Sequence, residues 1–283
     1  MRVWIAGSGY GSGRVMPAEE ARISLFDHGI TVGDGVFETI KAVGGRAFAL
    51  TRHLRRLAHS AEGLGLFPPD LDLLAGGIGE ALAANPEVDP ARVRVTVTAG
   101  PGPLGSERSG ESLTYAVAVA DFATPEPTVD VAVVPWLRNE RGALTGLKTT
   151  SYAENVRALD YAHRRGAGEA IFANTAGNLC EGTGSNIFVA GPATQGQLAT
   201  PPLSAGPLAG ITRALVLEWF GGEQSDVPMS ALAGLTEAFL TSSGRDVQPI
   251  RAIDGHVLAD APGPLTRKAM AVFAERSAAE MDP

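Results

Sequence analysis

The chain is short of cysteine, aromatic residues and charge. Its single cysteine, Cys180, excludes an internal disulfide and is typical of a reducing compartment, so we expect the cytoplasm. Aromatic residues make up only 6% of the 283 residues and charged residues 19%, yet no apolar run is long enough to cross a bilayer. The net charge of -8 offers no basic face to phosphate backbones. Neither nucleic acid nor a membrane is therefore expected as a partner.

Lysine is also scarce. Only Lys41, Lys148 and Lys268 occur among the 23 basic residues, and all the others are arginines. The guanidinium of arginine cannot serve as an amine nucleophile, whereas the lysine amine can. Each of the three lysines is therefore a candidate for amine chemistry.

The first half of the chain predicts a small domain of strands and helices. The hydrophobic patterns favour strands over 22–26, 35–40, 93–97 and 113–119, a helix after Thr51 that stops at Gly63, and a helix over 71–84. Residues 121–128 contain two prolines and have the composition of a linker. Because the length exceeds what one compact core usually needs, we expect a small α/β domain over 1–120, the linker, and a large domain over 129–283.

The second half mixes strands and helices without the regular alternation of a doubly wound sheet. We expect a strand over 129–134, a helix over 152–165, a hairpin of 170–174 with 186–190, a helix over 211–220, a strand over 238–242 and a last helix over 263–279. The fold class is accordingly α/β of the mixed, α+β kind.

Three familiar kinds of site are excluded. The glycine-rich segment 7–13 lacks the helix that must directly follow a dinucleotide-binding loop; Pro17 and a strand follow, so it is a turn. The five histidines have no metal-ligand spacing, so no metal is expected. No Gly-x-Ser-x-Gly elbow of a serine hydrolase occurs.

Lys148 is the first candidate for chemistry. It follows an apolar residue, Leu147, and precedes the small hydroxylated residues 149–151. A lysine that forms a Schiff base must be uncharged, and burial or cationic neighbours achieve this. The alternative is an ordinary surface lysine near the start of a helix.

Glu181 is the second candidate. It begins a glycine-rich bend, 181–185, directly before an apolar strand, and such a bend permits close approach to a ligand. A carboxylate against a pyridine nitrogen keeps that ring protonated and makes it an electron sink. The alternative is a solvated glutamate in a turn.

Three further segments fit a phosphate. Gly210 directly precedes a helix, so the amides of Ile211 and Thr212 form an anion site, unless they serve only as a helix cap. Ser242 and Ser243 end a strand and offer hydroxyls. An arginine cluster, Arg52, Arg55 and Arg56, contains a candidate charge-assisted donor, although arginines on a solvated helix face are common.

Taken together and in this order, these elements resemble the class IV aminotransferase family, the fold-type IV pyridoxal-phosphate enzymes. The resemblance extends from 27–38 to 247–250. It implies pyridoxal 5'-phosphate bound as a Schiff base to the catalytic Lys148, with Glu181 at the pyridine nitrogen. It further implies cofactor contacts from Arg56, Tyr152, Leu208, Gly210, Ile211, Thr212, Ser242 and Ser243. The family's architecture is a small α/β domain and a larger domain of β-barrel character, commonly in homodimers with shared active sites.

The resemblance implies a transaminase that moves an amino group between a primary amine or amino acid and a 2-keto acid. Among the family's subgroups, the segment 33–39 resembles the D-amino-acid or (R)-amine transaminases and the aminodeoxychorismate lyases more than the branched-chain aminotransferases. The segments 137–140 and 144–148 resemble the lyases, which release pyruvate and 4-aminobenzoate. We expect a D-amino acid or an (R)-amine as the donor. A non-catalytic cofactor-binding protein is the third alternative.

Two positions depart from the D-amino-acid transaminases. Ala99 stands where those enzymes carry a carboxylate-binding arginine, and Phe37, a substrate-site position, stands where they use a tyrosine. We expect Arg108 or Arg138 to bind the substrate carboxylate instead.

Overall fold

The computed structural model describes residues 1–7, 9–110 and 112–283, and their contacts divide the chain into two units. Unit 1 comprises Met1–Ala123, Leu147–Ser151 and Met281–Pro283. Unit 2 comprises Thr124–Gly146 and Tyr152–Glu280. The segment that carries Lys148 therefore packs with unit 1, although the residues on both sides of it belong to unit 2.

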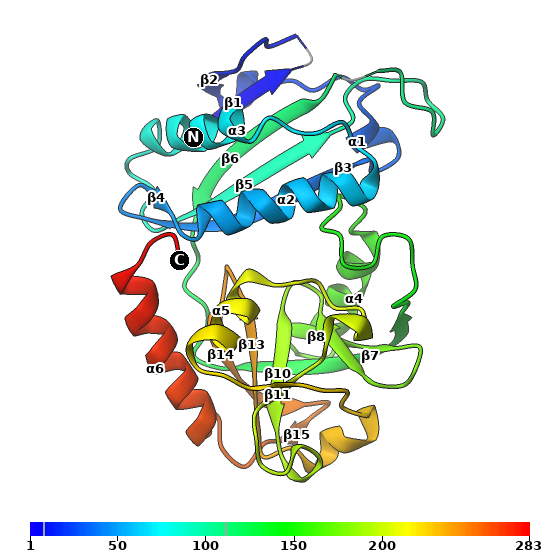
Figure 1. Ribbon diagram of the computed structural model, residues 1–283, viewed down its shortest axis with the longest axis vertical. Coiled ribbons are helices and arrows are strands. Elements are labelled where there is room, and N and C mark those ends of the chain that lie inside the picture. The colour runs from blue at the N-terminus through cyan, green and yellow to red at the C-terminus, as the bar shows by residue number, and fades with distance from the viewer. Residues whose placement is uncertain (8, 111) are drawn as a thin grey trace. The chain divides into compact units, whose positions relative to one another are not determined.

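Unit 1 is built on an antiparallel sheet of six strands in the order β2-β1-β6-β5-β3-β4 (Figure 1). The strands are β1 (Arg2–Gly7), β2 (Arg14–Pro17), β3 (Gly35–Val43), β4 (Arg46–Ala47), β5 (Ala91–Thr98) and β6 (Thr114–Asp121). The helices are α1 (His28–Thr31), α2 (Leu50–Leu64) and α3 (Leu71–Ala83), with a short 3-10 turn, η1 (Ala18–Glu20). The glycine-rich segment 7–13 connects β1 to β2 as a turn, although Ser8 lies outside the described residues.

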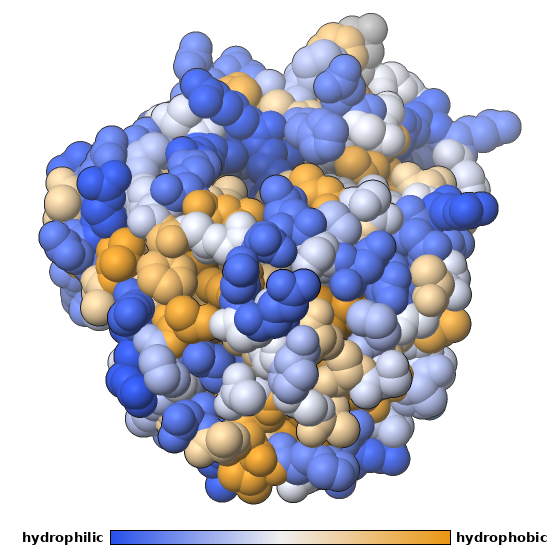
Figure 2. Space-filling model, turned by 60° about the horizontal axis from the view of Figure 1, so that its bottom comes forward, coloured by the Kyte–Doolittle hydropathy of each residue, from blue (hydrophilic) through white to orange (hydrophobic). Residues whose placement is uncertain are grey.

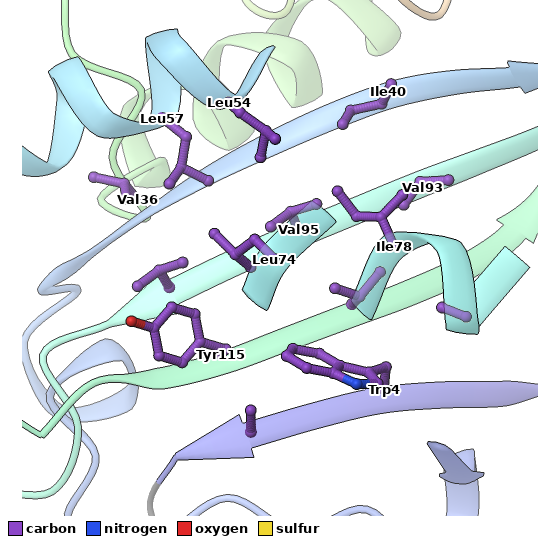
Figure 3. Close-up of a cluster of buried hydrophobic side chains, with 14 of the residues drawn as sticks. Trp4, Val36, Ile40, Leu54, Leu57, Leu74, Ile78, Val93, Val95 and Tyr115 are labelled. Atoms are coloured by element: carbon purple, nitrogen blue, oxygen red, sulfur yellow. The ribbon is translucent and has the colours of Figure 1, made fainter. Parts of the chain in front are cut away.

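The core of unit 1 lies between the sheet and helices α2 and α3 (Figure 3). Strand β5 alternates, with valines turned inward and Arg92 and Arg94 turned outward, which is the period of two that a half-buried strand requires. Leu54 and Leu57 of α2 and Leu74 of α3 meet these valines. The predicted strands over 35–40 and 93–97 and the helix over 71–84 are confirmed.

Helix α2 differs from its prediction at both ends. It begins at Leu50, and Asp282 accepts hydrogen bonds from the backbone nitrogen and the hydroxyl of Thr51, at 2.9 and 2.6 Å. The helix passes through Gly63 and ends at Leu64, and Gly65, with φ 72°, is its C-cap. A Cβ on Gly63 would lie 2.6 Å from Leu147 Cδ2. This glycine therefore permits close packing and does not end the helix.

The strand expected over 22–26 is wrong. The backbone nitrogen of Phe26 donates to Ser24 Oγ, and that of Asp27 donates to the Ser24 carbonyl, so the chain turns here. Asp27 then caps α1 by accepting a hydrogen bond from the nitrogen of Gly29 at 2.8 Å. The local hydrogen bonds of one serine outweigh the apolar pattern that suggested a strand.

Unit 2 contains a mixed sheet of nine strands that curls on itself (Figure 1). Eight of them follow the order β12-β11-β10-β13-β14-β7-β8-β9, and β15 pairs with β14. The strands are β7 (Val129–Arg138), β8 (Glu169–Asn174), β9 (Leu179–Gly182), β10 (Asn186–Ala190), β11 (Ala199–Thr200), β12 (Glu223–Gln224), β13 (Glu237–Ser242), β14 (Asp246–Ile253) and β15 (His256–Val257). The helices are α4 (Ala153–His163), α5 (Ile211–Trp219) and α6 (Pro264–Ala279), with 3-10 turns η2 (Pro192–Thr194), η3 (Leu203–Ala205) and η4 (Met229–Gly234).

The predicted strands and helices of unit 2 all occur, but the hairpin of 170–174 with 186–190 is wrong. Strand β9 lies between them in the chain and pairs with β8, whereas β10 pairs with β11 and β13. Both predicted strands are fully buried, so nothing in their hydrophobicity indicates which neighbour each one takes. The stacked rings of Phe188 and Phe239, with centroids 4.9 Å apart, join β10 to β13.

The face shown in Figure 2 carries apolar side chains in several areas with hydrophilic ones between them. Unit 1 exposes several large apolar residues close together in sequence, namely Ile23, Leu25, Phe26, Ile30 and Val32. Among the described residues, no helix is both long enough and apolar enough to span a membrane.

Candidate active site

The Lys148 segment is attached to the start of β3 by backbone pairing. The nitrogen of Phe37 donates to the Lys148 carbonyl at 3.0 Å, and Val36 forms a β-bridge with Thr149. The nitrogen of Lys148 donates to Ser60 Oγ of α2 at 3.1 Å. Both peptide groups of the lysine are therefore fixed, which restricts where its amine can reach.

Two cationic side chains meet the ring of Phe37. Lys148 Nζ lies 4.3 Å from the ring centroid, and Arg94 Cζ lies 3.3 Å from it. Arg94 stands on β5 beside the Phe37 strand, where Phe37 pairs with Thr96 and Thr39 pairs with Arg94. A guanidinium on an aromatic face is held by the ring's negative charge density.

Glu38, the next residue of β3, points to the opposite face of the strand and meets helix α2 there. Its carboxylate accepts from Arg56 Nε and Nη2 at 2.7 and 2.6 Å, and His53 Nδ1 lies 2.7 Å away. Burial by itself raises the pKa of Glu38, but the charges and hydrogen bonds of Arg56 and His53 outweigh this and lower it to about 2. Burial, opposed by Glu38 and assisted by the charges of Arg56 and Lys148, lowers the pKa of His53.

The other two arginines of the cluster are placed differently. Arg52 Nε donates to the carbonyl of Pro283 at 2.7 Å, and Arg55 is exposed. Arg56, by contrast, is oriented by Glu38, which lies on the same strand as Phe37.

The side chain of Arg108 donates hydrogen bonds to other residues of unit 1. Its Nε and Nη2 donate to the two carboxylate oxygens of Asp34, both at 2.7 Å, and Nη2 also donates to the Leu64 carbonyl at 3.0 Å. Nη1 donates to the carbonyl of Gly65. The guanidinium thus ties the 101–110 loop to the C-terminal end of α2, where the backbone carbonyls lack helical partners.

In unit 2, Glu181 at the end of β9 is held by the loop before α5. Its Oε2 accepts a hydrogen bond from the nitrogen of Leu208 at 2.9 Å. The Leu208 carbonyl in turn accepts from Asn186 Nδ2 at 2.9 Å. The structure therefore brings the two residues assigned to the cofactor ring, Glu181 and Leu208, into direct contact.

Arg138 lies beside the same glutamate. Its Nε is 3.9 Å from Glu181 Oε1, its Nη1 donates to Glu154 Oε2 at 2.7 Å, and its guanidinium lies 4.2 Å from the ring centroid of Phe172. Arg138 also donates to Asn155 Oδ1 at 3.3 Å. Its donors thus face residues of unit 2, and the substrate role expected for it stays a prediction.

The start of α5 has the features of a phosphate site. No side chain caps it, so the first amides, from Ile211 and Thr212, keep their capacity to bind an anion. A Cβ on Gly210 would lie 1.8 Å from Asn186 Oδ1, so any side chain there would displace the Asn186 amide or the start of α5. On β13, against which α5 packs, the hydroxyl of Thr241 is buried without a hydrogen-bond partner in the described part of the chain.

The remaining predicted residues are close to these elements in the chain. Ser242 ends β13, Ser243 begins the turn after it, and Tyr152 directly precedes α4. Serine hydroxyls at the end of β13, a glycine-led start of α5 and the buried hydroxyl of Thr241 are the kinds of donor that suit a phosphate. The residues present thus fit pyridoxal 5'-phosphate.

A small antiparallel α/β unit and a curled mixed sheet are the architecture of the fold-type IV class of pyridoxal-phosphate enzymes. The chain belongs to the class IV aminotransferase family: residues 35–253 match the family described as Amino-transferase class IV. Enzymes of this family use pyridoxal 5'-phosphate as their cofactor.

Relatives in this family have different activities. D-alanine aminotransferase of Bacillus licheniformis is 30% identical over 274 residues, which cover 90% of this chain and 92% of the relative. The bifunctional aminodeoxychorismate lyase/D-amino acid transaminase of Mycobacterium tuberculosis is 30% identical over 266 residues, 81% and 85% of the two chains. The branched-chain aminotransferase of Thermoproteus uzoniensis, solved with norvaline, has a TM-score of 0.87 and 30% identity over 97% of this chain and 94% of that one.

Proposed function

We propose that the protein is a pyridoxal-phosphate-dependent transaminase that moves an amino group from a D-amino acid or (R)-amine to a 2-keto acid. The observation that carries this proposal is the placement of Lys148. Its peptide groups are held by Phe37 and Ser60, and its amine shares the Phe37 ring with a second cation, Arg94. An oriented amine beside an anion-binding group suits a reaction on amino and keto acids.

Each residue then has a defined task. Bound pyridoxal 5'-phosphate supplies the electron sink that stabilises negative charge at the substrate carbon. Lys148 Nζ would hold the cofactor covalently and, as a free amine, would accept the α-proton of the substrate and give it back. Glu181 keeps the pyridine nitrogen protonated while Leu208 orients its carboxylate. The family pattern assigns Lys148 and Glu181 to one cofactor.

The phosphate is proposed to bind at the start of α5, to the amides of Ile211 and Thr212 and the hydroxyls of Thr212 and Ser243. Arg56 contributes a charge-assisted donor in an orientation that Glu38 determines. Ser242 and Gly210 complete this set, and Tyr152 is assigned to the phenolic oxygen of the cofactor by the family resemblance.

Arg94 is proposed as the residue that binds the substrate carboxylate. The sequence interpretation missed it because alternate arginines on a strand look like its solvated face. Its position on the Phe37 ring beside Lys148 favours it over Arg108, whose donors are occupied by Asp34 and the end of α2. No local pattern indicated this role, because Arg94 comes close to Phe37 only through the pairing of β3 with β5.

Aminodeoxychorismate lyase remains the second candidate. The M. tuberculosis relative, named for both activities, is 30% identical to this chain, so one scaffold of this family serves both. The same lysine would remove the same proton, and the electrons would then expel pyruvate.

The visible spectrum of the purified holoenzyme distinguishes the two activities. D-alanine, L-leucine and an (R)-arylalkylamine are added in turn without keto acid. We expect a lasting conversion to the pyridoxamine form with D-alanine or the (R)-amine. Conversion with L-leucine alone would contradict the donor preference, and no conversion with any donor would favour the lyase.

We further propose that the protein forms a homodimer. Leu25 and Leu104 of unit 1 are 79% and 72% exposed, and the neighbouring Phe26 and Ile30 are also exposed. Covering such apolar side chains favours association. Sedimentation velocity should give twice the chain mass, and Leu25→Asp should shift it toward the monomer; a monomeric parent protein would contradict the proposal.

A further inference from the structure

Arg213 is a buried cation whose partners are all neutral. It lies in the first turn of α5, and its side chain is 4% exposed. Nη2 donates to the carbonyl of Pro201 and to Gln224 Oε1, both at 2.8 Å, whereas Nε is buried without a partner. Within the described part of the chain, no carboxylate forms an ion pair with it.

A buried charge without a counter-charge is costly, because neutral carbonyls replace only part of the lost hydration. Burial accordingly lowers the pKa of Arg213, and no acidic neighbour opposes this. The other strongly buried charges of unit 2 are better compensated: Glu169 accepts from Arg245, and Glu237 accepts from the first amides of α6. Arg213 therefore differs from its neighbours in lacking compensation.

Arg213 carries this charge in the first turn of α5, where the phosphate is proposed to bind. It follows Gly210, Ile211 and Thr212 directly, so it shares the helical turn whose amides bind the cofactor phosphate in the proposed function. Its contact with Pro201 also closes the loop 201–210, which carries Leu208. A helix N-terminus and a cation in the same turn both lower the energy of an anion there.

We propose that Arg213 is a positioning residue for the cofactor phosphate, whose dianion provides the counter-charge that the protein does not. This inference rests on the proposed function, because it takes the start of α5 as the phosphate site. It makes a prediction for the affinity for the phosphate and for the stability of the cofactor-free protein. Neutralising the charge of Arg213 should lower the affinity without lowering the stability.

Gln224→Glu is the decisive variant, because it adds a carboxylate at the existing acceptor of Nη2. We expect a higher thermal midpoint for the cofactor-free chain and an affinity for pyridoxal 5'-phosphate that is lower by about tenfold. Pyridoxal, which lacks the phosphate, should bind as it does to the parent protein. Gln197→Glu, the same change at an exposed residue of unit 2, serves as the matched control and should change neither quantity.

Arg213→Met and Arg213→Lys give an independent test, since both lose the planar fork and only lysine keeps the charge. Lysine should retain the affinity for pyridoxal 5'-phosphate within about threefold, and methionine should lose about tenfold. Equal losses in the two variants, or a parallel loss of pyridoxal binding, would show that Arg213 only closes the loop. Unchanged cofactor affinity in Gln224→Glu would also overturn the inference. If the parent protein binds no pyridoxal 5'-phosphate, the proposed function fails instead.

Discussion

Glu38 holds Arg56 by two hydrogen bonds, to Nε at 2.7 Å and to Nη2 at 2.6 Å, and its side chain is 1% exposed. His53 completes the group from one turn earlier on α2. Since Glu38 follows Phe37 on β3, the strand that anchors Lys148 also orients the arginine assigned to the phosphate. Two consecutive residues of one strand thus contact Lys148 and Arg56, the residues proposed for the two ends of the cofactor.

Glu38→Ala should destabilise the protein by about 3–5 kcal/mol, because it leaves buried Arg56 and His53 without their acceptor. Urea unfolding of the variant and the parent protein measures this. Arg251→Gln, which removes the exposed pair with Asp130, is the control and should cost less than about 1 kcal/mol. Similar small losses in the two variants would contradict the structural importance of the Glu38 group.

The same group predicts how stability depends on pH. The pKa of Glu38 is lowered to about 2, so its contribution is complete above its unfolded value of 4.5 and is lost as the pH falls toward 2. The pKa of His53 is lowered from 6.5, so the unfolded chain takes up its proton first and stability decreases as the pH falls below 6.5. In His53→Gln, the decline that begins near pH 6.5 should become shallower, while the decline below 4.5 remains. Unfolding free energies at successive pH values test this, and an identical profile for the variant would contradict it.

Gly210→Ala should weaken binding of pyridoxal 5'-phosphate by more than about tenfold. Its Cβ would lie 1.8 Å from Asn186 Oδ1, and relief of that clash displaces either the start of α5 or the side chain that holds Leu208. Gly184→Ala is the control, since a Cβ there meets nothing within 4 Å. Fluorescence titration with the cofactor gives both affinities. Equal affinities would place the phosphate elsewhere.

Arg94→Gln should raise the Michaelis constant for 2-keto acids by about tenfold or more, because a charged hydrogen bond to the carboxylate is lost. The constant for an (R)-arylalkylamine, which has no carboxylate, should not change. Arg92→Gln, the preceding outward arginine of β5, is the matched control. Unchanged keto-acid kinetics in Arg94→Gln, with an increase in Arg108→Ala, would return the carboxylate role to Arg108.

Regular elements were predictable where one hydrophobic period was unambiguous. Helix α3 and strand β5 follow such patterns and appear where they were expected. The ends of α2 were not predictable, because Asp282 caps its start from 231 residues away and Gly63 packs against Leu147. The pairing of β8 and β10 could not be read from strands that are buried on both faces.

Candidate site residues could be named from the sequence where motifs are contiguous, and their roles stay predictions. Lys148, Glu181 and the start of α5 each stand in a short segment whose residue types suit their chemistry. Arg94 and Glu38 were missed because their importance arises from cross-strand and strand-to-helix contacts that no local pattern records. For the same reason the sequence could not indicate that Arg108, a loop arginine, donates to Asp34, which is 74 residues away.

The central claim is that Lys148 holds the cofactor covalently. Borohydride reduction of the purified protein, followed by proteolysis and mass spectrometry, tests it directly among the three lysines of the chain. We predict a reduced pyridoxyl-phosphate adduct on Lys148 alone, and its loss, with loss of turnover, in Lys148→Ala. An adduct on Lys41 or Lys268, or native turnover in Lys148→Ala, would contradict the account.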